Sequence, residues 1–146
     1  MPRPEATEAL KPTIERARGV AFTFAHLGLP GPGPAGLMPS AAKAHLKALL
    51  SMSAWPNVFV KISGLYAVRE AVGIADHRSP EHTYVDVLLQ SFGAEHCMWG
   101  SDFSPVLAHN SFEDALRIER VSRLPAPEAE KVMGGTLREL LQSRRA

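Results

Sequence analysis

Three short apolar runs recur along this chain at wide intervals, and they constrain its fold more than any other feature. The runs lie near residues 20–26, 58–63 and 97–102, and each ends at a glycine, serine or proline break. Each reads as a continuous apolar run, which is typical of strands buried on both faces of a parallel sheet. Segments of helical length separate the runs, and such alternation predicts crossover units. The sequence therefore predicts an α/β fold with three parallel strands.

Helix signals fill the intervals between these runs. Apolar residues recur at helical spacing in most of these segments, and Ser40 is a candidate N-cap. Capping boxes are expected at Ser111–Asp114 and Thr136–Glu139. The helices are predicted at residues 5–18, 40–55, 81–92, 111–123, 128–133 and from 136 onward, the last with Leu137, Leu140 and Leu141 on its buried side.

Length and composition indicate one soluble domain over residues 1–146. The chain is 45% hydrophobic and 21% charged, with a net charge of +1, which is ordinary for a globular protein with a core. It has no basic stripe that would favour nucleic acid and no apolar run of membrane-spanning length. A single cysteine, Cys97, excludes an internal disulfide and fits a reducing compartment. We expect a cytoplasmic protein that binds neither nucleic acid nor membrane.

Two of the three predicted strands end on residues that can move protons or bind metal. His26 follows the first strand and Asp102 follows the third. Ligands of parallel α/β folds bind beyond the carboxyl ends of the strands, where imidazole and carboxylate serve as metal ligands or proton carriers. The alternatives are a structural His26 and an Asp102 that caps a turn by bonding Ser104. Lys61, inside the second strand, needs a carboxylate or a cavity to face and is read as structural.

The remaining candidates carry weaker signals. Cys97 has no activating base nearby and is expected to be a small buried residue. No phosphate-binding loop or nucleophile elbow is present. Five other histidines lie on helices or loops without ligand spacing and are read as solvated, although the last of them follows the third strand closely enough to touch a ligand: His45, His77, His82, His96 and His109.

Four motifs in order give the chain a family resemblance. They are "FAHLGLP", "WPNVFVKISGL", "FGAEHCMWGSDFSP" and "VMGGTLRELL". Together they resemble the C-terminal half of the amidohydrolase-related family, whose usual forms are close to "DHxGxP", "PNVYVKLSGL", "FGxDRLMWGSDWP" and "GGNALRLL". This branch contains sugar-acid lactonases and decarboxylases of the aminocarboxymuconate-semialdehyde type.

The resemblance implies the C-terminal half of a (β/α)8 barrel and roles for particular residues. His26 matches the family's active-site histidine, a metal ligand or substrate contact. Asp102 matches the aspartate at the end of the last strand, which binds the metal where one is present and activates water. Ser63 and Trp99, at the ends of the second and third strands, are the expected substrate contacts. The expected cofactor is a divalent metal, with zinc first.

Several departures from the family pattern affect these expectations. Ala25 replaces the usual aspartate before His26, Ser104 is an extra residue, and Thr136 stands where asparagine is usual. No His-x-His pair occurs, whereas a catalytic zinc normally has three protein ligands. A full barrel needs about 250 residues. We therefore expect an N-terminally truncated domain with an incomplete metal site, open sheet edges and little or no activity in isolation.

Three functions remain open on the sequence alone. The first is hydrolysis of a lactone or similar small cyclic carbonyl compound, with Asp102 as general base. The second is non-enzymatic, an assembly module that forms a homo-oligomer or pairs with a complementary N-terminal chain through its open sheet. The third is decarboxylation by the same residues.

Overall fold

A three-stranded parallel sheet forms the centre of the protein, as the sequence predicts. The computed structural model describes residues 4–68, 79–109 and 111–143. The strands are β1 (Phe22–Phe24), β2 (Val58–Ile62) and β3 (Cys97–Trp99), with β2 in the middle. β1 and β3 end earlier than expected, and beyond them His26 and Asp102 adopt left-handed φ angles of 52° and 53° that turn the chain out of the extended region.

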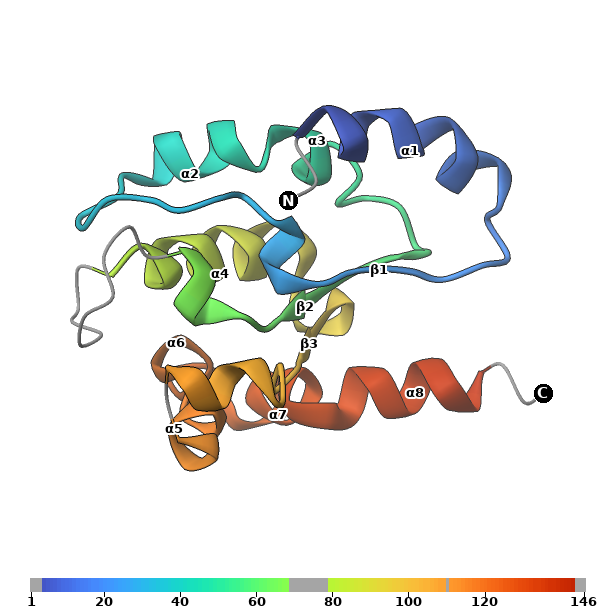
Figure 1. Cartoon of the computed structure of the whole chain (residues 1–146). Helices are drawn as coiled ribbons and strands as arrows, with labels where there is room; N and C mark the ends of the chain where they lie inside the picture. Colours follow the sequence, from blue (N-terminus) through green and yellow to red (C-terminus); the bar gives the residue numbers. More distant parts are fainter. Residues whose placement is uncertain (1–3, 69–78, 110, 144–146) are drawn as a thin grey trace.

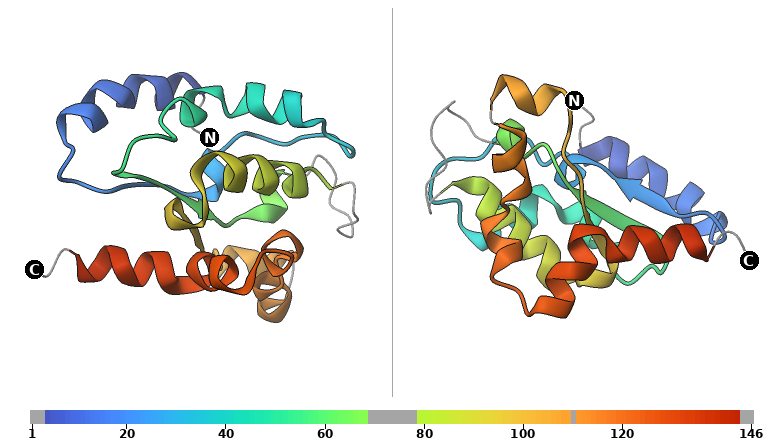
Figure 2. Two further views of the ribbon diagram at one scale, coloured as in Figure 1. Left: turned by 180° about the vertical axis from the view of Figure 1, so that it is seen from behind. Right: turned by 90° about the horizontal axis from the view of Figure 1, so that it is seen from below.

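Helices flank the strands, and those that bury apolar residues share one core cluster with the sheet. In Figure 1, α1, α2 and α3 run above the strands, and α5 to α8 lie below them; the view from behind in Figure 2 shows the same arrangement. The α-helices are α1 (Pro4–Arg16), α2 (Pro39–His45), α3 (Lys47–Leu50), α4 (Pro80–Phe92), α5 (Phe112–Leu116), α6 (Glu119–Ser122), α7 (Ala126–Glu130) and α8 (Thr136–Gln142). Short helical turns join several of these elements. No described helix is both long and apolar enough to cross a membrane.

Two predicted helices are interrupted. The segment predicted as one helix over 40–55 is split at Leu46, whose ψ of 3° leaves helical geometry, so that α2 and α3 are separate. The segment predicted over 111–123 is split at Arg117, with ψ 78°, between α5 and α6. In both cases apolar spacing continues across the break, which is why the sequence pattern does not reveal it.

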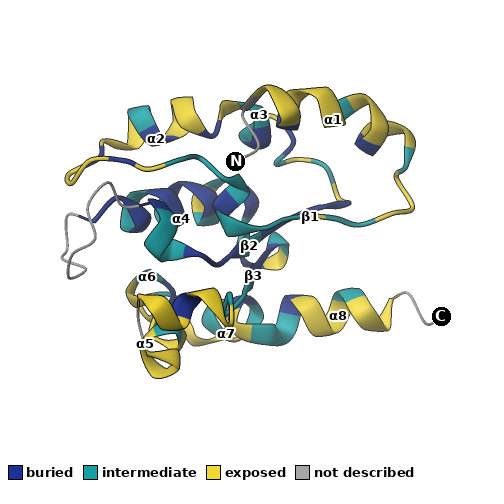
Figure 3. Ribbon diagram, viewed as in Figure 1, coloured by how far each residue is buried: buried dark blue, intermediate teal, exposed yellow. Residues whose placement is uncertain are grey.

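One face of the sheet packs on the main core. Val58, Val60 and Ile62 of β2 are completely buried there, in the cluster that also holds α4 (Figure 3). Since side chains alternate along a strand, Lys61 lies on the opposite face. Its stem passes over Gly100, where an added Cβ would lie 2.7 Å from Lys61 Cδ. Among the described residues no carboxylate pairs with Lys61, and its structural role stays a prediction.

The C-terminal segment packs against β3 differently from the prediction. The π-helical turn η5 (Lys131–Gly135) lies beside β3 and buries Val132 completely. The Thr136 hydroxyl does not cap α8; it donates a hydrogen bond to the Ala94 carbonyl oxygen, 2.7 Å away. Leu137 and Leu141, predicted to be buried, are 41% and 55% exposed, because no described element covers that side of α8.

Two of the histidines predicted to be solvated are packed against protein groups. His96 is half-buried, stacks on Phe59 at 4.8 Å between ring centroids and hydrogen-bonds to the Val58 carbonyl oxygen. His82 is half-buried beside Glu119, with 3.6 Å between Nε2 and Oε2. His45 and His109 are exposed as predicted, although His45 also hydrogen-bonds the Tyr84 hydroxyl and His109 stacks on a tyrosine ring. His77 lies outside the described residues. Local polar partners, which a one-dimensional pattern does not show, account for the difference.

Candidate functional site

The ends of β1 and β3 bring His26 and Asp102 together. His26 opens the turn η1 (His26–Gly28) after β1, and Asp102 lies three residues beyond β3. His26 Nδ1 is 3.7 Å from Asp102 Oδ2, and the two side chains are 34% and 17% exposed. The pair is therefore sheltered but open to solvent. The Asp102 side chain bonds to Tyr66, described below, and no bond to Ser104 is found in the described structure, so the turn-capping alternative is not observed.

Ser63 fixes the histidine from the middle strand. It lies directly after β2 and is almost fully buried. The His26 backbone N–H donates to Ser63 Oγ at 3.2 Å, and the same oxygen is 3.2 Å from His26 Nδ1. The ring nitrogen is within hydrogen-bond distance of Ser63 Oγ, and Asp102 Oδ2 lies farther away at 3.7 Å. Ser63 holds the orientation of His26.

Gly64 permits this close packing. Its φ of +62° is in the left-handed region, which glycine adopts without strain. A Cβ at this position would lie 2.7 Å from His26 Nδ1 and 3.3 Å from Asp102 Oδ2. Any other residue would push the pair apart.

Tyr66 is the residue that sequence reasoning missed. It lies in the turn η2 (Leu65–Val68), and its hydroxyl donates to Asp102 Oδ2 at 2.6 Å. Burial, then the hydrogen bond to Asp102 and the charge of that carboxylate, raise the pKa of Tyr66 to about 12. The ring stacks on His109 with 4.3 Å between centroids. Its position three residues after Ser63 at a strand end is the one signal in the sequence that could have indicated it.

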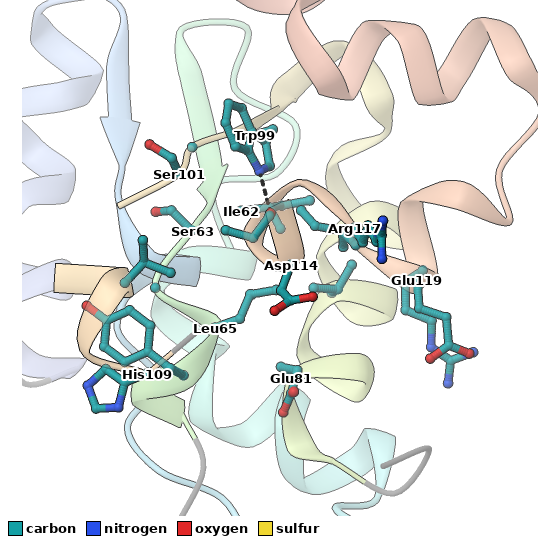
Figure 4. Close-up of a pocket in the computed structure, with 18 of the residues that line it drawn as sticks. Ile62, Ser63, Leu65, Glu81, Trp99, Ser101, His109, Asp114, Arg117 and Glu119 are labelled. Carbon is teal, nitrogen blue, oxygen red and sulfur yellow. Dashed lines mark hydrogen bonds between the residues drawn. The ribbon is translucent and has the colours of Figure 1, made fainter. Parts of the chain in front are cut away.

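A cavity of about 640 Å³ adjoins the pair beyond the ends of β2 and β3. Figure 4 shows side chains from the strand ends, α4, α5 and α6 around it. The predicted substrate contacts Ser63 and Trp99 line it, whereas His26 and Asp102 do not. Since Ser63 and Gly64 touch His26 and also line the cavity, residues 63–66 form the partition between the two.

Trp99 is held in the cavity wall. Its Nε1–H donates to the Ala115 carbonyl oxygen of α5 at 3.1 Å, drawn as a dashed line in Figure 4. Its indole also meets Phe112 edge to face, at 6.5 Å between centroids. Because its polar group is bonded to protein, Trp99 can offer a ligand only its apolar surface.

Three basic residues that line the cavity each lie beside a carboxylate. His82 lies beside Glu119, Arg117 beside Glu113, and Arg120 Nε is 3.3 Å from Asp86 Oδ2. Opposite charges thus offset one another, and the cavity has no concentrated positive charge for an anionic ligand.

The described residues supply only part of a metal site. His26 Nδ1 and Asp102 Oδ2, 3.7 Å apart, are close enough for both to bind one zinc ion at bond lengths of about 2 Å. Within the part of the chain that the structure describes, no group of three or more His, Cys, Asp or Glu could hold a metal. A catalytic zinc normally takes three protein ligands, so this chain's described residues do not complete one.

Comparison with known proteins places these features in one family. The amidohydrolase family profile matches residues 3–142. Over 95 residues the chain is 36% identical to the L-fucono-1,5-lactonase of Burkholderia multivorans. The aligned region covers 61% of this chain and 32% of the lactonase.

Solved structures share the fold at lower identity. The crystal structure of an amidohydrolase from Burkholderia multivorans with bound zinc matches with a TM-score of 0.77 and 24% identity, covering 94% of this chain and 49% of that one. Amidohydrolase 2 from Bifidobacterium longum subsp. infantis matches with a TM-score of 0.64 and 18% identity, covering 94% and 45%. The chain spans about half the length of these structures and about a third of the lactonase. By the extent of the family match, the chain belongs to the amidohydrolase family.

Proposed function

We propose that this chain carries the His26–Asp102 part of a hydrolase site that acts on a lactone or similar cyclic carbonyl compound. The observation that carries the proposal is the sheltered Asp102 carboxylate beyond β3, beside His26 and bonded by Tyr66. Tyr66 and His26 flank this carboxylate at a strand end, and a positioned carboxylate is a candidate general base. The chain would be the C-terminal half of a (β/α)8 barrel, in which such strand ends form the active site.

In the proposed reaction Asp102 accepts a proton from water. The water oxygen adds to the lactone carbonyl carbon while His26 polarises the carbonyl oxygen. The ring C–O bond then breaks, and the proton is delivered to the departing alkoxide, which gives an open hydroxy acid. A divalent metal, zinc first, would be held by His26 and Asp102 with further ligands from outside the described residues, and would supply Lewis acidity when bound.

Two observations favour a neutral lactone as the substrate. The relative from Burkholderia multivorans is an L-fucono-1,5-lactonase. The cavity adjoins the pair across residues 63–66, so it would take the part of the substrate away from the reacting carbonyl, and its paired charges suit a hydroxylated, uncharged group better than a carboxylate. The apolar face of Trp99 could contact the C–H groups of such a ring.

The test is hydrolysis of a sugar 1,5-lactone by the purified chain, alone and with the N-terminal half of the Burkholderia lactonase added. We expect little or no turnover by the chain alone and acid release after complementation. Asp102→Asn should lower that rate by about 10²–10⁴-fold, the usual contribution of a general base. Glu128→Gln, at an exposed carboxylate of α7 outside the cavity lining, is the control and should retain most activity.

Three outcomes would change the proposal. Hydrolysis that Asp102→Asn leaves intact would remove Asp102 as the base. Release of carbon dioxide would favour the decarboxylase alternative, which uses the same residues. Substantial turnover by the chain alone, abolished by Asp102→Asn, would show that no complementary half is needed.

A second, non-enzymatic function is favoured by the open sheet. The outer edges of β1 and β3 have no strand partner among the described residues, and Leu137 and Leu141 are exposed on α8 beside β3. We propose that this side of the molecule pairs with another copy or with a complementary N-terminal chain.

A further inference from the structure

We propose that Tyr66 is the positioning residue of this site. Its hydroxyl holds one oxygen of Asp102, Oδ2, and leaves the other, Oδ1, to face water or substrate, while His109 fixes the Tyr66 ring. The inference rests on the proposed function only for the role of Asp102 as a base; the contacts themselves do not depend on it.

The two oxygens of the Asp102 carboxylate have different contacts. Oδ2 receives the Tyr66 hydroxyl at 2.6 Å and lies 3.7 Å from His26 Nδ1. In the described part of the chain no side chain or backbone group donates to Oδ1. An O–H···O⁻ bond of this length is charge-assisted and about twice as strong as a neutral one. Tyr66 is therefore the contact that sets the rotation of the Asp102 carboxylate.

Backbone hydrogen bonds fold the loop that follows β3 back on itself. The Val106 N–H donates to the Asp102 backbone carbonyl at 3.0 Å, and the His109 N–H donates to the Val106 carbonyl at 3.0 Å. These two bonds fold the loop back, so that Asp102 at its start accepts the Tyr66 hydroxyl and His109 at its end stacks on the Tyr66 ring. The His109 ring lies nearly parallel to that of Tyr66, at 14°. The tyrosine is held at its hydroxyl and on one face.

The ring of Tyr66 lies between the cavity and Asp102, and His109 lies beside it. Tyr66 and His109 line the cavity, whereas Asp102 does not. A small molecule that fills the cavity meets the tyrosine before it meets the carboxylate. Tyr66 thus connects the cavity to the orientation of Asp102.

The experiment compares Tyr66→Phe with Tyr84→Phe by NMR at one fixed pH. The readouts are the side-chain carboxyl ¹³C signal of Asp102 and the ring ¹⁵N signals of His26. Tyr84 is the other tyrosine of the chain; it is fully buried and its hydroxyl bonds His45. It therefore controls for the loss of a buried phenol hydroxyl at a different place. Urea unfolding of each variant separates loss of stability from loss of position.

We expect Tyr66→Phe to shift or split the Asp102 and His26 signals, and Tyr84→Phe to lower stability without moving them. His109→Ala, which keeps the tyrosine hydroxyl and removes the stacked ring, should shift the same signals in the same direction by less. Unchanged Asp102 and His26 signals in Tyr66→Phe would overturn the proposal, as would equal shifts in Tyr84→Phe. Since no readout needs lactone turnover, this result stands apart from the test of the proposed hydrolysis.

Discussion

Gly64 gives a direct test of how tightly His26 and Asp102 are packed. Gly64→Ala places a Cβ at 2.7 Å from His26 Nδ1 and at a φ of +62°. The left-handed conformation alone costs a non-glycine residue about 1–2 kcal/mol. We expect a larger loss of unfolding free energy than this, together with displaced His26 ring signals in NMR spectra.

The matched control is Gly31→Ala. Gly31 has a φ of +84° but no atom within 4 Å of an added Cβ, so that only the conformational cost applies. Equal losses in the two variants, measured by urea unfolding, would show that the space beside His26 relaxes and that the pair is not tightly packed.

The alkaline titration of Tyr66 reports on its bond to Asp102. The pKa of Tyr66 is raised from 10.0 to about 12 by burial, then by the hydrogen bond and charge of Asp102. The folded state therefore binds this proton more tightly than the unfolded state. The resulting stabilisation is complete below pH 10 and is lost as the pH rises from about 10 to about 12.

We expect Asp102→Asn to lower the pKa of one tyrosine toward 10. Tyrosinate absorbance measured against pH would show this change. The pKa of Tyr84, which burial also raises to about 12, should stay in place and serve as the internal reference. An unchanged absorbance curve would mean that burial alone holds the proton on Tyr66.

Residues at strand ends were predictable, and residues in the turns that follow them were not. His26 and Asp102 had to lie at one edge, because carboxyl ends of parallel strands meet there. Their separation of 3.7 Å depends on left-handed backbone at both residues, which apolar patterning does not encode. Tyr66 reaches Asp102 only because η2 turns it back, and the folded loop from Asp102 to His109 sets the stack.

Two predicted capping boxes give a comparison at the level of whole helices. Ser111 Oγ accepts the Asp114 N–H at 3.0 Å, as predicted, and caps α5. Thr136 instead donates to the buried Ala94 carbonyl. Ser111→Ala should therefore reduce hydrogen-exchange protection of α5 by about 1 kcal/mol, the usual value of an N-cap. Global stability should change little, because α5 has no buried residue.

Thr136→Val should act on the whole molecule. It removes one of the two hydrogen bonds to the buried Ala94 carbonyl, which the Cys97 N–H also bonds, and the loss of one such bond costs about 1 kcal/mol. We expect urea unfolding to give a lower free energy of unfolding than for the unmodified chain. Hydrogen-exchange protection should fall in α8 by no more than it falls in β3. If Thr136→Val frayed only α8, the predicted cap would be the better description after all.

The elements themselves were predictable to different degrees. The three strands follow from their apolar runs, because a parallel sheet between helices needs such runs. The breaks at Leu46 and Arg117 leave the apolar spacing unchanged, so the pattern predicts one helix where two exist. Leu137 and Leu141 show the opposite case: their spacing predicts a buried face, and the described chain holds nothing that covers it.

The open sheet and the exposed leucines point in one direction for the whole molecule. The chain spans about half the length of the solved amidohydrolases it matches. The outer edges of β1 and β3 have no partner strand in the described structure, and unpaired edges are places where another chain can add. A parallel sheet normally has both faces covered, yet Lys61 on the face opposite the core is only half-buried.

Self-association of the purified chain is the final prediction. By light scattering after size exclusion we expect a mass above the 15.8 kDa of one chain at micromolar concentration. Leu137→Glu combined with Leu141→Glu places two charges on the exposed side of α8 and should return the mass toward one chain. Met38→Glu, at a residue that is 65% exposed before α2, is the control and should leave the mass unchanged. If the unmodified chain is a folded, monodisperse monomer, self-pairing is contradicted. The complementary N-terminal half, added in the same experiment, would then be tested as the partner by the mass increase that its binding would cause.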